Sequence, residues 1–421
     1  MPDFSIYGDS IRSLNRNMRF FLLTAFFVCL AQSVDIVLLN LYLKNRGFSN
    51  SLLGEIESMR FWASLLLSVP GGLLSDRIGR KKAIQIAIVF CSLAHILRAT
   101  VPDPTALMAA TFMQGAFYSL LFISISPYIA EQTEPEHRAA VYSLFFAFFT
   151  AVGILGYTFG GALPDILHTR GMDLLAGQRL TLVGASIIFI MALIPTTFVS
   201  DQRQLNIAGD QSVSSPAEDQ EPKKQQGFWQ TLRLLPVAER RAIISFTVPD
   251  IFSGIGSALV IPLLTIFFST QHNLSSSTIG MVQAAGELSI IVATVIGPLV
   301  SARIGIVKSI ALFQIFSAPF LLLMGNASLL PLALLGYLLR NALMNSLSPL
   351  KSTLQMQRIS PPFRGFAASC AEVGFSLSRA LFSGLGGALS ESYGFPVLYS
   401  VASVFYLLAG TLYYLLNRER Q

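Results

Sequence analysis

The chain has 421 residues, of which 53% are hydrophobic and only 12% are charged, and it carries a formal net charge of +6. A soluble globular protein has about 25% charged residues, so this composition excludes a chain whose whole surface faces water. Backbone groups in lipid must find their hydrogen bonds within the segment, and an all-α integral membrane protein is therefore expected.

Twelve apolar runs follow one another along the chain, each close to the about 20 residues that a spanning helix needs. The predicted spans are 18–43, 51–74, 83–101, 105–129, 141–163, 178–199, 242–268, 277–300, 308–325, 329–349, 366–389 and 395–416. The long polar stretch between the sixth and seventh spans is rich in Ser, Gln, Glu and Lys, which predicts a flexible linker. The predicted organisation is an N-terminal six-helix half at 1–199, a cytoplasmic linker at 200–241 and a C-terminal six-helix half at 242–421.

The end of this linker has a helical pattern. Phe228, Leu232 and Leu235 fall on one helical face. That spacing is typical of a helix lying in the cytoplasmic membrane interface, and a plain loop fits the same residues equally well.

The basic residues predict the orientation of the spans. Lys and Arg are enriched in cytoplasmic loops of membrane proteins. If both termini are cytoplasmic, the inner segments hold 21 Lys and Arg, and the outer loops hold five, among them Arg98. We therefore expect a multi-pass protein of the cell (inner or plasma) membrane with cytoplasmic N- and C-termini. This distribution also explains the net charge without a nucleic-acid partner.

One segment of the chain occurs twice. The sequence GGLLSDRIGRKKAI at 71–84 recurs as GPLVSARIGIVKSI at 297–310, and the same offset of 226 residues relates Arg138 to Arg364. A shift of six spans preserves orientation, so the two halves are predicted to be parallel repeats. In transporters built from such repeats the substrate site lies near the membrane midplane between the halves, which rock to alternate access.

The first copy is similar to the signature loop between spans two and three of the major facilitator superfamily, Gly-x-x-x-Asp-Arg-x-Gly-Arg-Arg. The matching residues are Gly72, Asp76, Arg77, Gly79, Arg80 and Lys81. Through the repeat, the resemblance covers all twelve spans and implies a monomeric transporter of a small molecule. It also implies that Asp76 contacts the start of span eleven, near Arg364 and Gly365, when the inner side is shut. The second copy has Ala302 in place of Asp76, so only the first half is expected to carry this gating contact.

Two positions depart from patterns found in many proton antiporters of this family. Thr111 stands in span four where those proteins carry Arg, and Tyr157 stands in span five where they carry Pro. Both departures count against standard drug–proton antiport.

Polar and charged side chains inside the spans are candidates for function, because they are costly to bury in a membrane. The proton-coupling candidates are Asp35, Glu57, Asp250, Glu287 and Glu372. The candidates for substrate binding or charge pairing are Arg60, Arg340, Asn341, Asn345 and Arg379.

Spacing suggests partners for some of these groups. Glu57 and Arg60 are three residues apart and can pair on one helix face. Glu372 and Arg379 are seven apart, which suits either a static ion pair or a functional one. Asp35 has no cation on its own helix, and the family resemblance places span one at the central cavity. It is therefore the first choice for a proton carrier.

No phosphate-binding loop of the form G-x-x-x-x-G-K-S/T and no His-Glu-x-x-His motif is present. We expect a transporter rather than an enzyme, with no cofactor and no metal, whose partners are a small-molecule substrate, protons and the lipid bilayer. The aromatic-rich spans favour proton-coupled export. The membrane arginines, Thr111 and Tyr157 favour the alternative, uptake of a polar or anionic nutrient by symport or uniport. A receptor or scaffold that has kept the fold and lost transport is the third hypothesis.

Overall fold

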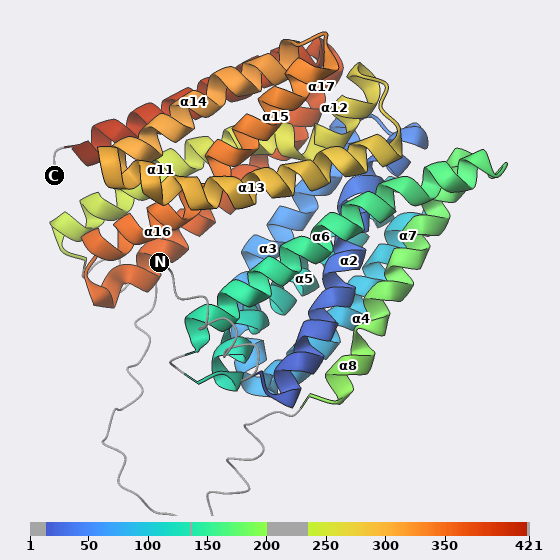
Figure 1. The fold of residues 1–421 in the computed structure, drawn as a ribbon, viewed down its shortest axis with the longest axis horizontal. Helices are drawn as coiled ribbons and strands as arrows, with labels where there is room; N and C mark the ends of the chain where they lie inside the picture. The colour runs from blue at the N-terminus through green and yellow to red at the C-terminus, as the bar shows by residue number, and fades with distance from the viewer. Residues whose placement is uncertain (1–13, 135–136, 200–234, 419–421) are drawn as a thin grey trace, which may run out of the picture.

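The computed structural model describes residues 14–134, 137–199 and 235–418, and Figure 1 shows them as two helical bundles. The first bundle consists of α2 (Arg16–Asn45), α3 (Asn50–Ile78), α4 (Arg80–Thr100), α5 (Pro104–Gln132), α6 (Arg138–Thr169), α7 (Leu174–Met191) and α8 (Leu193–Thr197). The second consists of α11 (Val237–Val260), η1 (Ile261–Leu263), α12 (Leu264–Gln271), α13 (Ser276–Ile304), α14 (Ile306–Asn326), α15 (Leu330–Asn345), α16 (Leu347–Arg358), η2 (Pro361–Phe363) and α17 (Arg364–Asn417).

Most of the predicted linker at 200–241, including Phe228 and Leu232, lies outside the described residues. The helix that follows, α11, begins at Val237, earlier than the predicted start of the C-terminal half.

The described helices provide twelve passes. Nine of them are long and apolar enough to span a membrane. The charged helix α3 and the 16-residue α15 add two more passes. The last comes from α17, which contains two helices joined at Gly394, where φ is 80°. The predicted fold, twelve membrane helices in two parallel six-helix repeats, is confirmed.

The repeat appears in the local structure as well as in the sequence. The hydroxyl of Ser49 caps α3 by accepting from the Leu52 amide at 3.2 Å, and Ser275 caps α13 in the same way. Gly79 ends α3 with a φ of 91°, and Gly305 ends α13 with a φ of 87°. Such positive φ values favour glycine because it has no Cβ. Each pair is separated by the offset of 226 residues.

The two halves touch at one end, which we call the outer end because the sequence predicts that it faces away from the cytoplasm. Gly54 of α3 packs so closely on α17 that a Cβ would lie 2.4 Å from the carbonyl oxygen of Ser383. Gly280 of α13 packs on α6, where a Cβ would lie 2.2 Å from the carbonyl oxygen of Tyr157. The offset of 226 relates Gly54 to Gly280 and Tyr157 to Ser383. The outer ends are therefore closed by two equivalent helix crossings, which we call the outer crossings.

Hydrogen bonds join the halves in the same region. The Asn40 amide donates to the carbonyl of Pro262 at 2.8 Å, and the Asn50 amide donates to the Ser390 hydroxyl at 3.1 Å. Away from these contacts the bundles diverge, towards α8 on one side and α16 on the other (Figure 1). The fold thus has one closed end and one separated end. In the orientation that the distribution of Lys and Arg predicts, this arrangement faces inward.

Candidate substrate site

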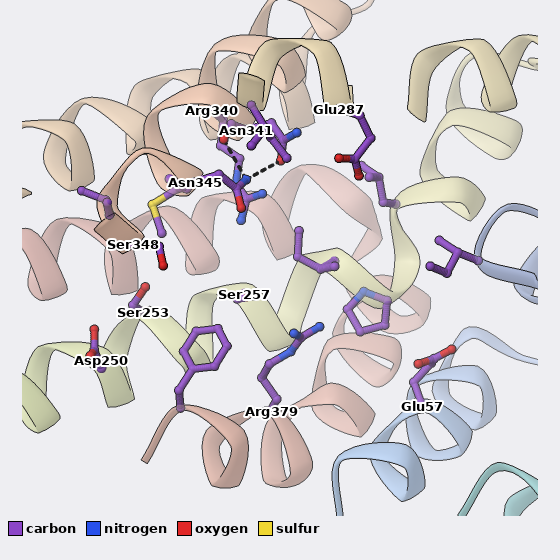
Figure 2. Close-up of a pocket in the computed structure, with 18 of the residues that line it drawn as sticks. Glu57, Asp250, Ser253, Ser257, Glu287, Arg340, Asn341, Asn345, Ser348 and Arg379 are labelled. Carbon is purple, nitrogen blue, oxygen red and sulfur yellow. Dashed lines mark hydrogen bonds between the residues drawn. The ribbon is translucent and has the colours of Figure 1, made fainter. Parts of the chain in front are cut away.

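A cavity of about 770 Å³ lies between the halves, with walls from α2, α3, α6, α11, η1, α12, α13, α15, α16 and α17. This volume is within the range of about 300–1,000 Å³ typical of small-molecule sites. All of the sequence-predicted proton-coupling and binding candidates line it: Asp35, Glu57, Arg60, Asp250, Glu287, Arg340, Asn341, Asn345, Glu372 and Arg379. Figure 2 shows most of them gathered around one space.

The acids contributed by the N-terminal half are paired with cations. Glu57 and Arg60 form the predicted pair along α3, with 2.5 Å between the carboxylate and the guanidinium. Asp35 of α2 pairs with Arg98 of α4 at 3.0 Å. The expectation that Asp35 is unpaired is therefore wrong, because its cation comes from another helix.

Arg98 also differs from its predicted place in an outer loop. It is only 1% exposed, because it lies within α4, as the predicted span 83–101 also allows, and its side chain turns towards Asp35 of α2. His95, one turn earlier on the same helix, is 3% exposed, and both of its ring nitrogens lack a hydrogen-bond partner among the described residues. The helical spacing of His95 and Arg98 was the available sequence signal for this buried polar face.

In the C-terminal half, Asp250 pairs with Lys351, which α16 brings to the wall of the cavity. Sequence reasoning missed Lys351 because it assigned this residue to a cytoplasmic segment. Pro249, which precedes Asp250, lies within the helix α11. Figure 2 places Asp250 at the opposite side of the view from Glu57.

Two arginines of the C-terminal half face the cavity without forming an ion pair within the described part of the chain. Arg340 donates to the hydroxyl of Tyr406. The guanidinium carbon of Arg379 lies 4.0 Å from the centre of the Phe61 ring. The Nε atoms of both arginines are buried and have no hydrogen-bond partner in the same described residues.

Glu372 does not pair with Arg379. Its carboxylate accepts a hydrogen bond from Ser376 at 3.0 Å. A spacing of seven residues corresponds to about 10.5 Å along a helix, which is too far for direct contact between these two groups. Arg379 therefore keeps its guanidinium available to the cavity.

Glu287 forms no ion pair among the described residues either. Its carboxylate accepts a hydrogen bond from the Tyr157 hydroxyl at 3.4 Å. Next to it, the Asn341 amide donates to the Gly286 carbonyl at 3.0 Å, and the Asn345 amide donates to the Asn341 side-chain oxygen at 3.0 Å. Tyr157 was noted in the sequence only as a replacement for proline, so its contact with Glu287 was missed.

Two tyrosines were also missed as wall residues. Tyr337 donates to Gln283 at 3.0 Å, and Tyr406 accepts from Arg340. Tyr337 is three residues before Arg340 on α15, and this spacing was enough to place both on one face.

The signature loop lies at the inner end of the N-terminal half. Arg80 pairs with Asp76 at 2.5 Å and with Glu131 at 3.5 Å. The ammonium of Lys81 donates to the carbonyl of Val199 at 2.6 Å. Arg364, near the expected far partner of Asp76, donates instead to the carbonyl of Ile359 at 3.0 Å. The gating contact is expected when the inner side is shut, so it stays a prediction in this inward-facing structure.

The remaining residues of the motif have simpler surroundings. Gly79 separates α3 from α4, and a Cβ on Gly72 would meet only the Ile123 side chain, at 3.8 Å. Arg77 is exposed in the last turn of α3. Within the described residues, no group of three His, Cys, Asp or Glu side chains is placed to hold a metal ion.

Comparisons with known proteins agree with this architecture. The sequence model described as Major Facilitator Superfamily matches residues 21–248 and 251–421. The quinolone resistance protein NorA of Staphylococcus aureus (strain MRSA252) is 23% identical over 155 residues, which are 37% of this chain and 40% of NorA. The chain thus spans less than half the length of that relative. The putative tartrate transporter of Agrobacterium vitis is 23% identical over 303 residues, which are 68% of this chain and 63% of that protein.

Solved structures give the same fold. The crystal structure of a bacterial homolog of the human lysosomal transporter Spinster, in an inward-facing and occupied conformation, has a TM-score of 0.74 to this chain. The match covers 95% of this chain and 96% of that one, at 14% sequence identity. At this identity the likeness concerns the fold alone.

Proposed function

Since this chain belongs to the Major Facilitator Superfamily and is a multi-pass membrane transporter, we propose that it carries a small organic anion into the cell together with protons. The observation that carries this proposal is the pair of arginines, Arg340 and Arg379, that face the central cavity without forming an ion pair among the described residues. The inner end of the molecule is taken as cytoplasmic, as the distribution of Lys and Arg indicates.

The chemistry of these two groups favours an anion. A guanidinium is always charged and binds carboxylate or phosphate through two parallel hydrogen bonds. A buried charge without a partner is costly, and a negative substrate would supply the missing partner. The amides of Asn341 and Asn345 lie in the same wall and are suited to bind hydroxyl groups of the cargo.

The aromatic-rich spans that favoured export contribute little to this wall. Phe375 is the phenylalanine that lines the cavity in the described chain, and the other aromatic wall residues are Tyr157, Tyr337 and Tyr406. Phe146, from the phenylalanine-rich span five, is 52% exposed and is not among the residues that line the cavity. A polar cargo therefore suits the cavity better than an apolar one.

Glu287 is the proposed proton carrier, because it lines the same cavity and forms no ion pair among the described residues. A negative carboxylate repels an anion in the cavity, and a proton on it removes that repulsion. Proton and anion then favour each other's binding, and by linkage the effect is reciprocal. Two ligands that bind together cross the membrane together, so the expected coupling is symport.

The relatives support transport of this kind and also provide a second candidate. Tartrate, named for the Agrobacterium vitis relative, is a small dianion. The similarity to NorA favours proton-coupled export of an amphipathic drug instead. In that case cargo and proton would compete for the acids of the cavity and move in opposite directions.

The direction of proton movement tests the proposal. Purified protein would be reconstituted into proteoliposomes and supplied with radiolabelled tartrate, or with small carboxylates that raise its melting temperature in a binding screen. An alkaline interior and an acidic exterior should drive accumulation of the anion, accompanied by acidification of the interior. Accumulation driven by an acidic interior, or transport of a quinolone but of none of the carboxylates, would favour the export candidate.

A further inference from the structure

We propose that Tyr157 couples the protonation of Glu287 to the closing of the outer end, by contacting α13 at two points. This inference rests on the proposed role of Glu287 as the proton carrier. It assigns Tyr157 as a positioning residue that connects the cavity to one of the two outer crossings.

The first contact is between backbones. A Cβ on Gly280 would lie 2.2 Å from the carbonyl oxygen of Tyr157 and 3.2 Å from the Cα of Gly161. This contact forms the outer crossing of α6 on α13. It exists only while the outer end is closed, because opening must separate these two helices.

The second contact is made by the side chain of the same residue. The phenol of Tyr157 reaches into the cavity and donates to Glu287 at 3.4 Å. Glu287 lies seven residues beyond Gly280, which is two turns of α13. The separation of the helices that opens the outer end would therefore also remove the hydrogen-bond donor from Glu287.

The surroundings of Glu287 make this donor important. The titratable groups that interact with it are Tyr157 of α6, Cys29 of α2 and Tyr337 of α15. Among cations of the packed helices, Arg340 of α15 lines the same cavity and donates to the Tyr406 hydroxyl. Lys351 of α16 is held by Asp250, and Lys308 lies in the first turn of α14, at its inner end. The hydroxyl of Tyr337 donates to Gln283 and not to Glu287. Among the described residues, the side-chain hydrogen bond to the Glu287 carboxylate therefore comes from Tyr157.

The state of Glu287 then biases the outer end. A hydrogen bond to an ionised group is roughly twice as strong as one between neutral groups. The Tyr157 contact is therefore strongest when Glu287 has lost its proton, and it stabilises the closed outer end in that state. Closure in turn favours departure of the proton while the cavity faces inward, as symport requires.

The equivalent crossing in the other half is connected to the cavity differently, through Arg379 of α17 stacked on the Phe61 ring of α3. Ser383 takes the place of Tyr157, and its hydroxyl donates to the Arg379 carbonyl on its own helix at 2.7 Å. Phe61 takes the place of Glu287. The repeat thus provides an internal comparison. At both crossings a carboxylate accepts from the first turn of the opposing helix, Asp165 from the Ser277 amide and Glu391 from the Ser51 amide. Of Tyr157 and Ser383, only Tyr157 also donates to an acid of the cavity.

The test measures the outer end without any substrate. Spin labels would be attached at Thr169→Cys and Tyr393→Cys, which are exposed on opposite halves, in a cysteine-free background in lipid nanodiscs. Distances would be recorded between pH 5 and pH 9. In the wild type, the fraction of molecules with a closed outer end should rise with pH. Tyr157→Phe should lower the closed-to-open ratio at high pH by about tenfold, the size expected for losing a hydrogen bond to a charged group.

Control variants separate this coupling from general disturbance. Ser383→Ala should keep the wild-type pH dependence, whereas Glu287→Gln should abolish it. Adding Tyr157→Phe to Glu287→Gln should have little further effect, because coupled residues are non-additive. Three results would each overturn the proposal. They are an unchanged pH dependence in Tyr157→Phe, additive effects of Tyr157→Phe and Glu287→Gln, and label distances in the wild type that do not change with pH. A failure of anion uptake would leave these distances unaffected, so the two proposals fail separately.

Discussion

The two halves share one fold and differ in how their buried charges are balanced. In the N-terminal half, Asp35 pairs with Arg98 and Glu57 pairs with Arg60. In the C-terminal half, Arg340 and Arg379 face the same cavity and form no ion pair within the described chain. The Asp35–Arg98 pair joins α2 to α4, and the Glu57–Arg60 pair neutralises two charges on α3, whereas an unpaired cation is available to a ligand. The comparison favours a structural role for the N-terminal acids and supports the proposal that the C-terminal arginines bind the cargo.

The largest expected effect comes from breaking the most deeply buried pair. Arg98→Leu would leave Asp35, which is 4% exposed, as an uncompensated buried charge. Removing one partner of a buried pair costs about 3–5 kcal/mol. We expect a much lower midpoint in thermal unfolding of the detergent-solubilised protein, and substantial recovery in the double variant Asp35→Leu/Arg98→Leu.

The same residues test the earlier choice of Asp35 as the proton carrier. If Asp35→Asn keeps the unfolding midpoint and loses proton coupling, Asp35 is functional. The conclusion that the N-terminal acids have a structural role is then wrong. If it loses stability and the remaining folded protein still couples protons, the structural interpretation holds.

The next largest effect should appear in substrate affinity. Arg340→Gln and Arg379→Gln each remove a cation that forms no ion pair with an acid among the described residues. A hydrogen bond to a charged group contributes about 1.5–3 kcal/mol, which corresponds to a loss of about 10- to 150-fold in Kd for the anion. Isothermal titration with a carboxylate found by the binding screen would measure this loss.

The matched control is the double variant Glu57→Gln/Arg60→Gln. It removes one acid and one cation from the wall of the same cavity, so the net charge of the cavity does not change. Affinity should fall much less than in the single arginine variants. An equal loss in both cases would mean that the N-terminal pair also contacts the anion.

The outer crossings are the feature in which the two halves should behave alike. Gly54→Ala and Gly280→Ala each place a Cβ within 2.4 Å of a carbonyl oxygen on the opposing helix. Overpacking of this kind costs about 1–3 kcal/mol, so both variants should shift the outer end towards opening by a similar amount. The label pair at Thr169 and Tyr393 would report the shift, and Gly184→Ala, where nothing lies within 4 Å, should have no effect.

Much of this architecture was predictable from the sequence, because a hydrophobic run of fixed length and a repeat offset are properties of local segments. The spans, the repeat, the Glu57–Arg60 pair and the set of cavity residues needed no tertiary information. The partner of Asp35 could not be found in this way, because Arg98 approaches it from another helix, 63 residues away. Lys351 was missed for the same reason, since only the packing of α16 brings it to Asp250.

The smallest expected effect concerns the gating motif, where the halves again differ. Asp76 is held by Arg80 in this inward-facing structure and is predicted to reach the start of α17 when the inner side shuts. An acid at a helix N-terminus stabilises by about 0.3–1 kcal/mol. Asp76→Ala should therefore shift the inward–outward ratio about two- to fivefold towards the inward-facing state, as measured by labels on the inner ends of α5 and α16.

The second repeat allows the reverse experiment. Ala302 occupies the place of Asp76, and Arg138, at the start of α6, occupies the place of Arg364. Ala302→Asp should add a second contact and favour closure of the inner side by a similar factor, which would partly compensate Asp76→Ala in the double variant. If the ratio is unchanged in both single variants, the signature loop does not gate this transporter through a charge at a helix N-terminus. If only Asp76→Ala has an effect, the contact needs Arg80 and Lys81, because the second copy has Ile306 and Val307 at those places.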